Sequence, residues 1–226
     1  MIYITGNTHG DLSRFFKTGI KKMKENDILI ICGDFGFIWD GSENEKKNLE
    51  QIGKFKFKTL FVDGTHENFD ILDKYENIKI YDNTAKHIKG NLYQLMRGKV
   101  YNIENNIILT FGGGESDDKD MRVELNTWWK EEMPTIMQMK AAVEELNKVN
   151  RSVDFIVTHE PPLHIKNLIN QSCNNINQLN TFFEDLSKQV EYNHWFFGSL
   201  HIDKKFSRKF SSIFNDIYKL NDFKKI

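Results

Sequence analysis

IYITGNTHGD, residues 2–11, runs from a short apolar strand straight into a loop of polar and metal-binding residue types. The same arrangement, an apolar run closed by a polar loop, recurs four more times along the chain. The later apolar runs and the polar loops that follow them are 28–32 with Gly33-Asp34, 59–62 with Gly64–Glu67, 155–157 with Thr158-His159, and 195–197 with Gly198–His201. Any one of these loops alone would be an ordinary turn. Because loops at the carboxyl edge of an α/β sheet can converge on one crevice, five of them indicate a shared site.

The spacing of apolar residues predicts an α/β fold. Short apolar runs, typical of strands buried on both faces, lie at 2–5, 28–32, 59–62, 107–111, 153–157 and 195–197. Helical periodicity predicts helices over 12–24, over 45–54, from Pro134 onward and near 174–190. The runs 92–96, 100–103 and 107–111 are joined by turns too short for crossover helices, which predicts an antiparallel meander. The last residues, 222–226, are interpreted as a short polar tail.

Composition limits the classes of function. The 226 residues contain no Pro- or Ser-rich linker, so we expect one domain over residues 1–226. With 31 Lys and Arg against 32 Asp and Glu, no overall basic field favours nucleic acid. Cys32 and Cys173 form neither a CxxC motif nor a disulfide framework, which favours a reducing compartment. No leader pattern or membrane-length apolar run is visible, so we expect a cytoplasmic protein. The oligomeric state is not indicated.

The order and residue types of the five loops resemble the calcineurin-like metallophosphoesterases, in their small bacterial and phage form, over residues 2–203. That family's pattern reads Asp-x-His, Gly-Asp, Gly-Asn-His-Asp/Glu, a lone His and Gly-His-x-His. The resemblance implies two facing mixed β-sheets flanked by helices. It also implies divalent cations (Mn, Fe, Zn or Mg) that activate water to hydrolyse a phosphomonoester or phosphodiester. A phosphorylated small molecule or nucleotide is the implied substrate.

The resemblance assigns ligands to two cations. The first would take Asn7, His9, Asp34 and His201, and the second would take Asp34, Thr65, His159 and Ser199. Three of these depart from the family pattern, since Asn7 replaces an Asp, Thr65 an Asn and Ser199 a His. The first cation thus keeps three strong ligands and the second keeps two. We therefore expect a weakened centre, with one bound cation rather than two.

The resemblance also implies catalytic roles. His66 would be a general acid or a stabiliser of the transition state, Glu67 would orient its ring, and Asp34 would be shared by the cations. For His66, a turn-capping role remains the alternative.

Two further features could bind substrate. The glycine loop around Gly113 could wrap an anion with its backbone N–H groups, although a plain flexible turn is equally consistent with the sequence. Arg122 lies in a segment similar to one of small bacterial phosphoesterases, where it could hold a phosphate by two hydrogen bonds. The neighbouring pair Trp128-Trp129 favours packing beneath that segment.

Two hypotheses for function remain open. The first is a phosphoesterase with a weakened metal centre. The second is a family member that has lost hydrolysis and binds a phosphorylated ligand or a protein partner in the same crevice.

Overall fold

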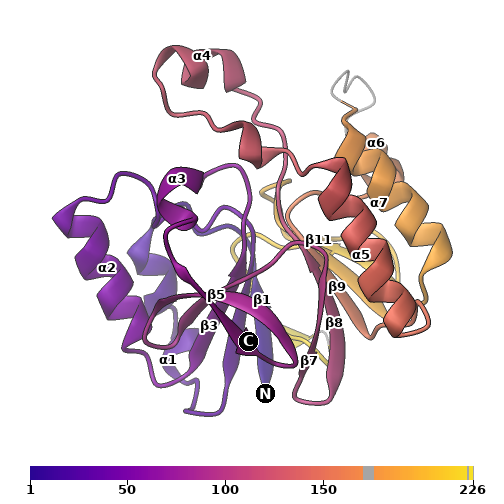
Figure 1. Ribbon diagram of the computed structural model, residues 1–226. Helices are drawn as coiled ribbons and strands as arrows, with labels where there is room; N and C mark the ends of the chain where they lie inside the picture. Colours follow the sequence, from indigo (N-terminus) through magenta and orange to yellow (C-terminus); the bar gives the residue numbers. More distant parts are fainter. Residues whose placement is uncertain (170–175, 223, 226) are drawn as a thin grey trace.

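The computed structural model describes residues 1–169, 176–222 and 224–225 as two β-sheets with helices on their outer faces (Figure 1). The larger sheet has the strand order β14-β13-β1-β2-β3-β6-β5-β4. Its strands are β1 (Ile2–Thr5), β2 (Ile28–Cys32), β3 (Lys58–Val62), β4 (Glu76–Ile80), β5 (Asn83–Lys89), β6 (Leu92–Leu95), β13 (Ile217–Lys219) and β14 (Lys224–Lys225). Parallel pairing joins β1, β2, β3 and β6, and antiparallel pairing adds the strands at both edges.

The smaller sheet has the order β11-β12-β10-β9-β8-β7. Its strands are β7 (Lys99–Ile103), β8 (Asn106–Phe111), β9 (Phe155–Thr158), β10 (His194–Phe197), β11 (Lys204–Lys205) and β12 (Phe210–Ser212). The strands β8, β9, β10 and β12 run parallel, whereas β7 and β11 pair antiparallel at the edges. Both sheets are mixed, so the expected pair of facing mixed sheets is confirmed.

Helices cover the outer face of each sheet (Figure 1). The first part of the chain forms a 3₁₀ helix η1 (Leu12–Phe16) and the helices α1 (Thr18–Lys21), α2 (Glu43–Gly53) and α3 (Phe69–Leu72). The middle and later parts form α4 (Lys119–Glu124), the 3₁₀ helix η2 (Lys130–Glu132), α5 (Ile136–Lys148), α6 (Leu163–Ile169) and α7 (Gln178–Gln189). Figure 1 shows α1 and α2 beside the larger sheet, α5 to α7 beside the smaller one, and α4 projecting from the body.

Alternating side chains on the central strands build three packed layers. On β2, Leu29 and Ile31 pack among the residues of α1 and α2, whereas Ile28 and Ile30 point into the layer between the two sheets. On the smaller sheet, Ile156 faces the layer beneath α5 and α7. Because both faces of these strands are buried, their sequences are apolar without interruption. The central strands were predicted for that reason.

The predicted helix over 12–24 is wrong as a single element. Lys17 is extended, with φ −61° and ψ 148°, and separates η1 from α1. Thr18 and Gly19, both weak helix formers, open α1 directly after this break, so helix propensity is low at the junction. The break lets the side chains of Arg14 and Phe15 turn into the protein.

The predicted meander is correct only in its second half. The strands β7 and β8 form an antiparallel hairpin, but β6 belongs to the other sheet. The chain changes sheets at the turn before β7, where Gly98 has φ +68°. The Tyr101 hydroxyl fixes this crossing, because it donates to Thr84 O at 2.6 Å and accepts from Met96 N at 2.8 Å.

Other element boundaries also differ from the predictions. The helix expected to open at Pro134 begins at Ile136, because Thr135 caps it in a reciprocal pair with Gln138. Part of the predicted polar tail is strand β14, which pairs with β13. Residues 174–175 of the last predicted helix, and Cys173, lie outside the described residues.

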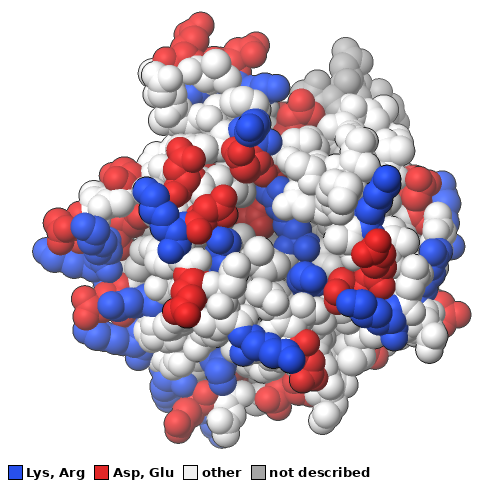
Figure 2. All heavy atoms as spheres, viewed as in Figure 1, with Lys and Arg blue, Asp and Glu red and all other residues white. Residues whose placement is uncertain are grey.

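The described surface has mixed charge. Basic and acidic side chains are interspersed over the face seen in Figure 2. Within the described ranges, no helix is long and apolar enough to cross a membrane.

Candidate metal centre

The polar loops after β1, β2, β3, β9 and β10 meet at one edge of the two sheets. They bring together the side chains of Asn7, His9, Asp34, Thr65, His66, His159, Ser199 and His201. In this group His9, Asp34 and His201 have left-handed backbones, with φ of 47°, 40° and 50°. Such a conformation is uncommon for residues other than glycine, although Asp and His adopt it more readily than most. It sets the direction in which these three side chains leave their loops.

The first part of the centre consists of two imidazoles and one carboxylate. His9 Nε2 lies 3.1 Å from His201 Nε2 and 3.8 Å from Asp34 Oδ2, and the ligand atoms of the three residues lie within 4.8 Å of one another. Two ligands that each bind an ion at about 2.1 Å lie roughly 3.0–3.6 Å apart. Burial lowers the pKa of His9 to about 4 and lowers that of His201, which keeps both rings neutral. Neutral imidazole is the form that binds metal, so the set fits one divalent cation.

Asn7 contacts this group through its amide nitrogen. Asn7 Nδ2 lies 3.1 Å from Asp34 Oδ2 and 2.9 Å from His201 Nε2. Its Oδ1 atom is buried and has no hydrogen-bond partner among the described residues. A half-turn of the amide would exchange the two atoms and direct Oδ1 toward Asp34 and His201. The orphaned oxygen is therefore the atom that a cation at this place would attract.

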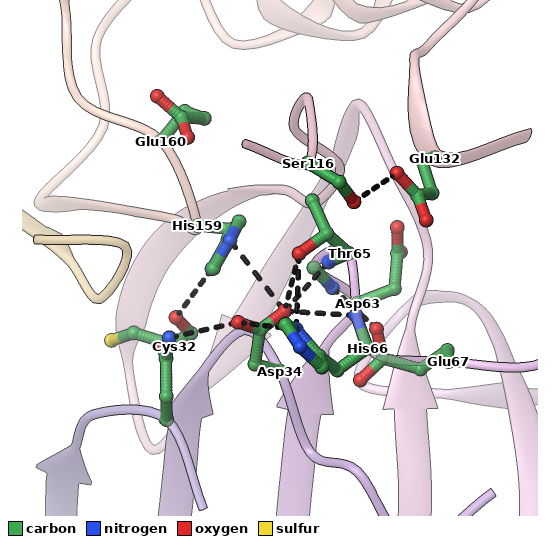
Figure 3. Close-up of polar contacts among 12 residues, drawn as sticks. Cys32, Asp34, Asp63, Thr65, His66, Glu67, Ser116, Glu132, His159 and Glu160 are labelled. Carbon is green, nitrogen blue, oxygen red and sulfur yellow. Dashed lines mark hydrogen bonds and ion pairs between the residues drawn. The ribbon is translucent and has the colours of Figure 1, made fainter. Parts of the chain in front are cut away.

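The second part of the centre has fewer strong donors. His159 Nε2 lies 3.6 Å from Asp34 Oδ1, while its Nδ1 faces the Cys32 carbonyl at 3.4 Å (Figure 3). Thr65 Oγ1 lies 3.3 Å from the same Asp34 oxygen. Ser199 Oγ is buried and lacks a hydrogen-bond partner within the described part of the chain. This half thus offers one imidazole and two hydroxyls, where the first half offers two imidazoles and an amide.

Asp34 connects the two halves, and Figure 3 shows its contacts with His159, Thr65 and His66. Its Oδ1 accepts from Thr65 N at 2.6 Å and from His66 N at 3.0 Å, and its Oδ2 faces the first half. Burial alone would raise the pKa of Asp34, but the neighbouring His159 and His66 outweigh burial and hold it well below its usual value. The carboxylate therefore stays ionised and can serve both halves.

His66 lies at the border of the centre. Its Nδ1 is 3.2 Å from Asp34 Oδ2 and 3.1 Å from Thr65 Oγ1. The hydrogen bond to Asp34 raises the pKa of His66. The ring is part of the centre rather than only a turn cap.

Glu67 has a different set of contacts from those expected. Its two carboxylate oxygens accept from Phe35 N at 2.6 Å and from Gly64 N at 2.8 Å. It thereby joins the loop of Asp34 to the loop of His66 by their backbones. The contacts that hold the His66 ring come from Asp34 and Thr65, so any influence of Glu67 on that ring passes through the loops.

Arg122 is buried, with 4 % of its surface exposed, and its donors face protein groups. Its guanidinium lies 2.7 Å from Glu132 Oε1, donates to Thr127 O at 2.8 Å and donates to Ser116 Oγ. Ser116 in turn donates to Glu132 Oε2 at 2.6 Å (Figure 3). This network fixes the segment between β8 and α5 and leaves the guanidinium little freedom to hold a phosphate.

Two backbone donors of the glycine loop are also engaged. Gly113 N donates to Asp63 O at 3.0 Å, and Gly114 N donates to Glu132 O at 3.0 Å. Gly113 has φ +91°, and a Cβ atom there would lie 2.7 Å from Glu132 O. The glycine is therefore required for close packing.

Trp39 and Glu132 are parts of the site region that sequence reasoning missed. The Trp39 ring stacks near His66, with centroids 6.3 Å apart, and Glu132 pairs with Arg122. The only sequence signal for Trp39 was its place five residues after Asp34, in the loop that follows β2. Glu132 has no signal, because it directly follows two charged and exposed residues, Lys130 and Glu131.

Comparisons with known proteins agree with this geometry. A family model for calcineurin-like phosphoesterases matches residues 2–204 of the 226. The matched range includes every residue of the centre described above, from Asn7 to His201. A search of curated proteins finds no match.

Proposed function

The chain belongs to the calcineurin-like phosphoesterase family, and we propose that it hydrolyses a phosphomonoester or phosphodiester with one tightly bound divalent cation. The family is metal-dependent, so a hydrolytic, metal-binding role is the starting point. The substrate we propose is a phosphorylated small molecule or nucleotide, and the location we propose is the cytoplasm.

One observation carries the proposal of a single cation. Two imidazoles and the Asp34 carboxylate converge within 4.8 Å on the side of His9 and His201. On the other side, His159 Nε2 lies 3.6 Å from Asp34 Oδ1, whereas His66 Nδ1 lies 3.2 Å from Asp34 Oδ2. Hydroxyl groups such as Ser199 Oγ are weak, neutral ligands for Mn or Zn. A second ion there would be bound loosely.

The protein's own groups have separate tasks. His9 and His201 would hold the cation together with Asp34, and Asn7 would add its amide oxygen after the half-turn. A cation bound there supplies activation of water and neutralisation of charge on the phosphoryl oxygens. His66, which borders the cation side, would hold the oxygen of the departing alcohol by a hydrogen bond. Glu67 and Arg122 would keep the surrounding loops in position.

An activity assay tests this proposal. In excess Mn²⁺ we expect slow hydrolysis of 4-nitrophenyl phosphate or of the bis-ester, below the ~10 per second that is typical of enzymes. Asp34→Asn should abolish it, whereas Asp185→Asn, an exposed change on α7, should not. Activity that survives Asp34→Asn would come from a contaminant and would contradict the proposal.

A second candidate function is binding of a phosphorylated ligand without hydrolysis. The observation in its favour is that Asn7 Nδ2 already satisfies Asp34 Oδ2 and His201 Nε2, as a cation would. A site whose ligand atoms are already hydrogen-bonded to Asn7 does not need metal to be stable. Phosphate binding in the presence of a chelator, measured by calorimetry, together with no turnover in Mn²⁺, would favour this candidate.

A further inference from the structure

A second pocket, of about 390 Å³, lies beside the metal centre. It is formed by the loop 36–42, the first turns of α2, and His9 and His66. His66 also lines the pocket that contains Asp34 and His201, so its ring is a shared wall. The volume lies within the range of small-molecule sites. A group attached to a phosphate at the metal centre would enter this second pocket past His66.

An aromatic ring forms one wall of the second pocket. Trp39 lies nearly parallel to His66, with an interplanar angle of 25°, and meets Trp129 edge-on at 5.6 Å between centroids. The Arg122 guanidinium lies 5.4 Å from the Trp39 ring centre. Trp39 is therefore supported by its neighbours and remains half-buried. A supported, partly exposed indole is suited to stacking against a planar ligand.

The backbone of this wall is also fixed. Glu45 Oε2 accepts from Trp39 N at 2.7 Å and from Asp40 N at 2.8 Å. Asn68 Nδ2 donates to Trp39 O at 2.7 Å. The loop is thus tied to α2 on one side and to the segment before α3 on the other, so the pocket is preorganised.

The polar groups of the pocket suit an uncharged ligand. Of the described residues that line it, none is lysine or arginine, whereas Asp40 and Glu45 are acidic. Hydrogen bonds from Ser42 lower the pKa of Asp40, which keeps it negative near neutral pH. The side-chain amides of Asn44 and Asn48 make no hydrogen bond within the described part of the chain. They offer both donors and acceptors to a neutral polar edge.

From these contacts we propose that the second pocket binds the alcohol portion of the phosphoester, and that this alcohol is uncharged and carries a planar ring, as a nucleoside does. The ring stacks on Trp39, its polar edge faces Asn44 and Asn48, and the ester oxygen points toward His66. The acidic lining disfavours an alcohol that carries further phosphates. This inference rests on the proposed phosphoesterase function, although binding of the alcohol itself requires neither metal nor hydrolysis.

The test separates binding from catalysis. Adenosine and ribose are titrated into the full chain in the presence of a chelator, by calorimetry. We expect adenosine to bind and ribose to bind far more weakly. Trp39→Leu should weaken adenosine binding about tenfold, because one base stacked on one aromatic ring contributes on that scale. Trp128→Leu removes a tryptophan outside the pocket and should leave adenosine binding unchanged.

Hydrolysis in Mn²⁺ gives the second readout. Adenosine 5′-monophosphate should be a better substrate than ribose 5-phosphate, and better than adenosine 5′-diphosphate, whose leaving group is charged. Asp40→Asn should narrow the difference in hydrolysis rate between adenosine 5′-monophosphate and adenosine 5′-diphosphate. The metal content should be the same in Trp39→Leu as in the unmodified chain.

Two results would overturn the inference. One is adenosine that binds no better than ribose. The other is binding that Trp39→Leu leaves unchanged in a folded protein. If adenosine binds as expected and neither nucleotide is hydrolysed, the pocket is supported and the proposed hydrolysis is wrong.

Discussion

Asn7 Nδ2 lies 3.1 Å from Asp34 Oδ2, so an amide donor stands where the family pattern has a second carboxylate. The contact has opposite consequences for the two states of the centre. Without a cation, the N–H group stabilises the buried Asp34 charge. With a cation, the neutral amide adds no negative charge, and its oxygen must first turn inward. Asn7 thus stabilises the metal-free protein and weakens metal binding.

Asn7→Asp should reverse both effects. A carboxylate at position 7 would face Asp34 Oδ2 without an intervening proton, so the metal-free protein should lose roughly 3 kcal/mol of stability. In excess Mn²⁺ the same change should raise the melting temperature above that of the unmodified chain, because two carboxylates bind a dication more strongly. Thermal unfolding in chelator measures the loss of stability, and thermal unfolding in Mn²⁺ measures the rise in melting temperature. Asn102→Asp, on the exposed part of β7, is the control and should show neither shift.

Restoring all three family ligands should create a two-metal centre. The combined change Asn7→Asp, Thr65→Asn and Ser199→His supplies a carboxylate to the first cation, and an amide and an imidazole to the second. We expect two ions per chain and a phosphodiesterase rate higher by orders of magnitude. Each single reversion should raise the metal content and the rate much less, because the effects of ligands to the same cation are coupled rather than additive. A folded triple variant that binds two ions and hydrolyses no ester on a broad panel would favour the ligand-binding function.

Arg122→Ala should act mainly on stability. Removing the guanidinium leaves Glu132, which is 1 % exposed, as a buried charge without its ion-pair partner. Breaking a buried ion pair in this way lowers the free energy of unfolding by about 3–5 kcal/mol. Denaturant unfolding measures the cost, with the exposed Lys119→Ala as the matched control. A variant of unchanged stability with a raised KM for phosphoesters would show instead that Arg122 binds the phosphate directly.

Acid should weaken the packing of α6 against α7 through Glu184. Burial opposes its ionisation, but hydrogen bonds from His164 and Lys188 outweigh burial and lower the pKa of Glu184 to about 2. Because this pKa is lower than the unfolded value of 4.5, the ionised group stabilises the fold above pH 4.5, and the contribution is lost as pH falls through about 2.

Glu184→Gln should therefore lower the free energy of unfolding by about 1–2 kcal/mol at neutral pH and by almost nothing near pH 2. The value at neutral pH is reduced for solvent screening. Chemical unfolding across that pH range measures the difference. Glu191→Gln, at an exposed position, should show no such pH dependence. A cost for Glu184→Gln that is equal at both ends of the range would contradict the assignment.

The central strands could be predicted from sequence because burial on both faces leaves an uninterrupted apolar run. The strands that were missed lack that signature. In β4 most side chains are exposed or half-buried, and β14 consists of two exposed lysines that depend on β13 for their pairing. Whether β6 continues into β7 in one sheet depends on tertiary contacts such as that of Tyr101 with Thr84, which no local pattern contains. The single domain over 1–226 stays a prediction.

The candidate site could be predicted in part for a related reason. Loops after parallel strands must meet at one edge, so Asp34 and the histidines were expected together, and they lie together. The direction of individual side chains could not be predicted in the same way. The engagement of Arg122 by Glu132, and of Glu67 by backbone N–H groups, depends on residues brought from other loops. The catalytic and metal-binding roles of the site residues stay predictions.

The number of divalent ions per chain tests the central claim most directly. It is measured by elemental analysis of protein purified without chelator and equilibrated with micromolar Mn²⁺ or Zn²⁺. We predict at most one ion per chain, lost in His201→Ala, because His9, Asp34 and His201 form the one group with two imidazoles and a carboxylate found among the described residues. Two ions per chain at that concentration would contradict the account, because Thr65 and Ser199 would then be sufficient ligands for the second.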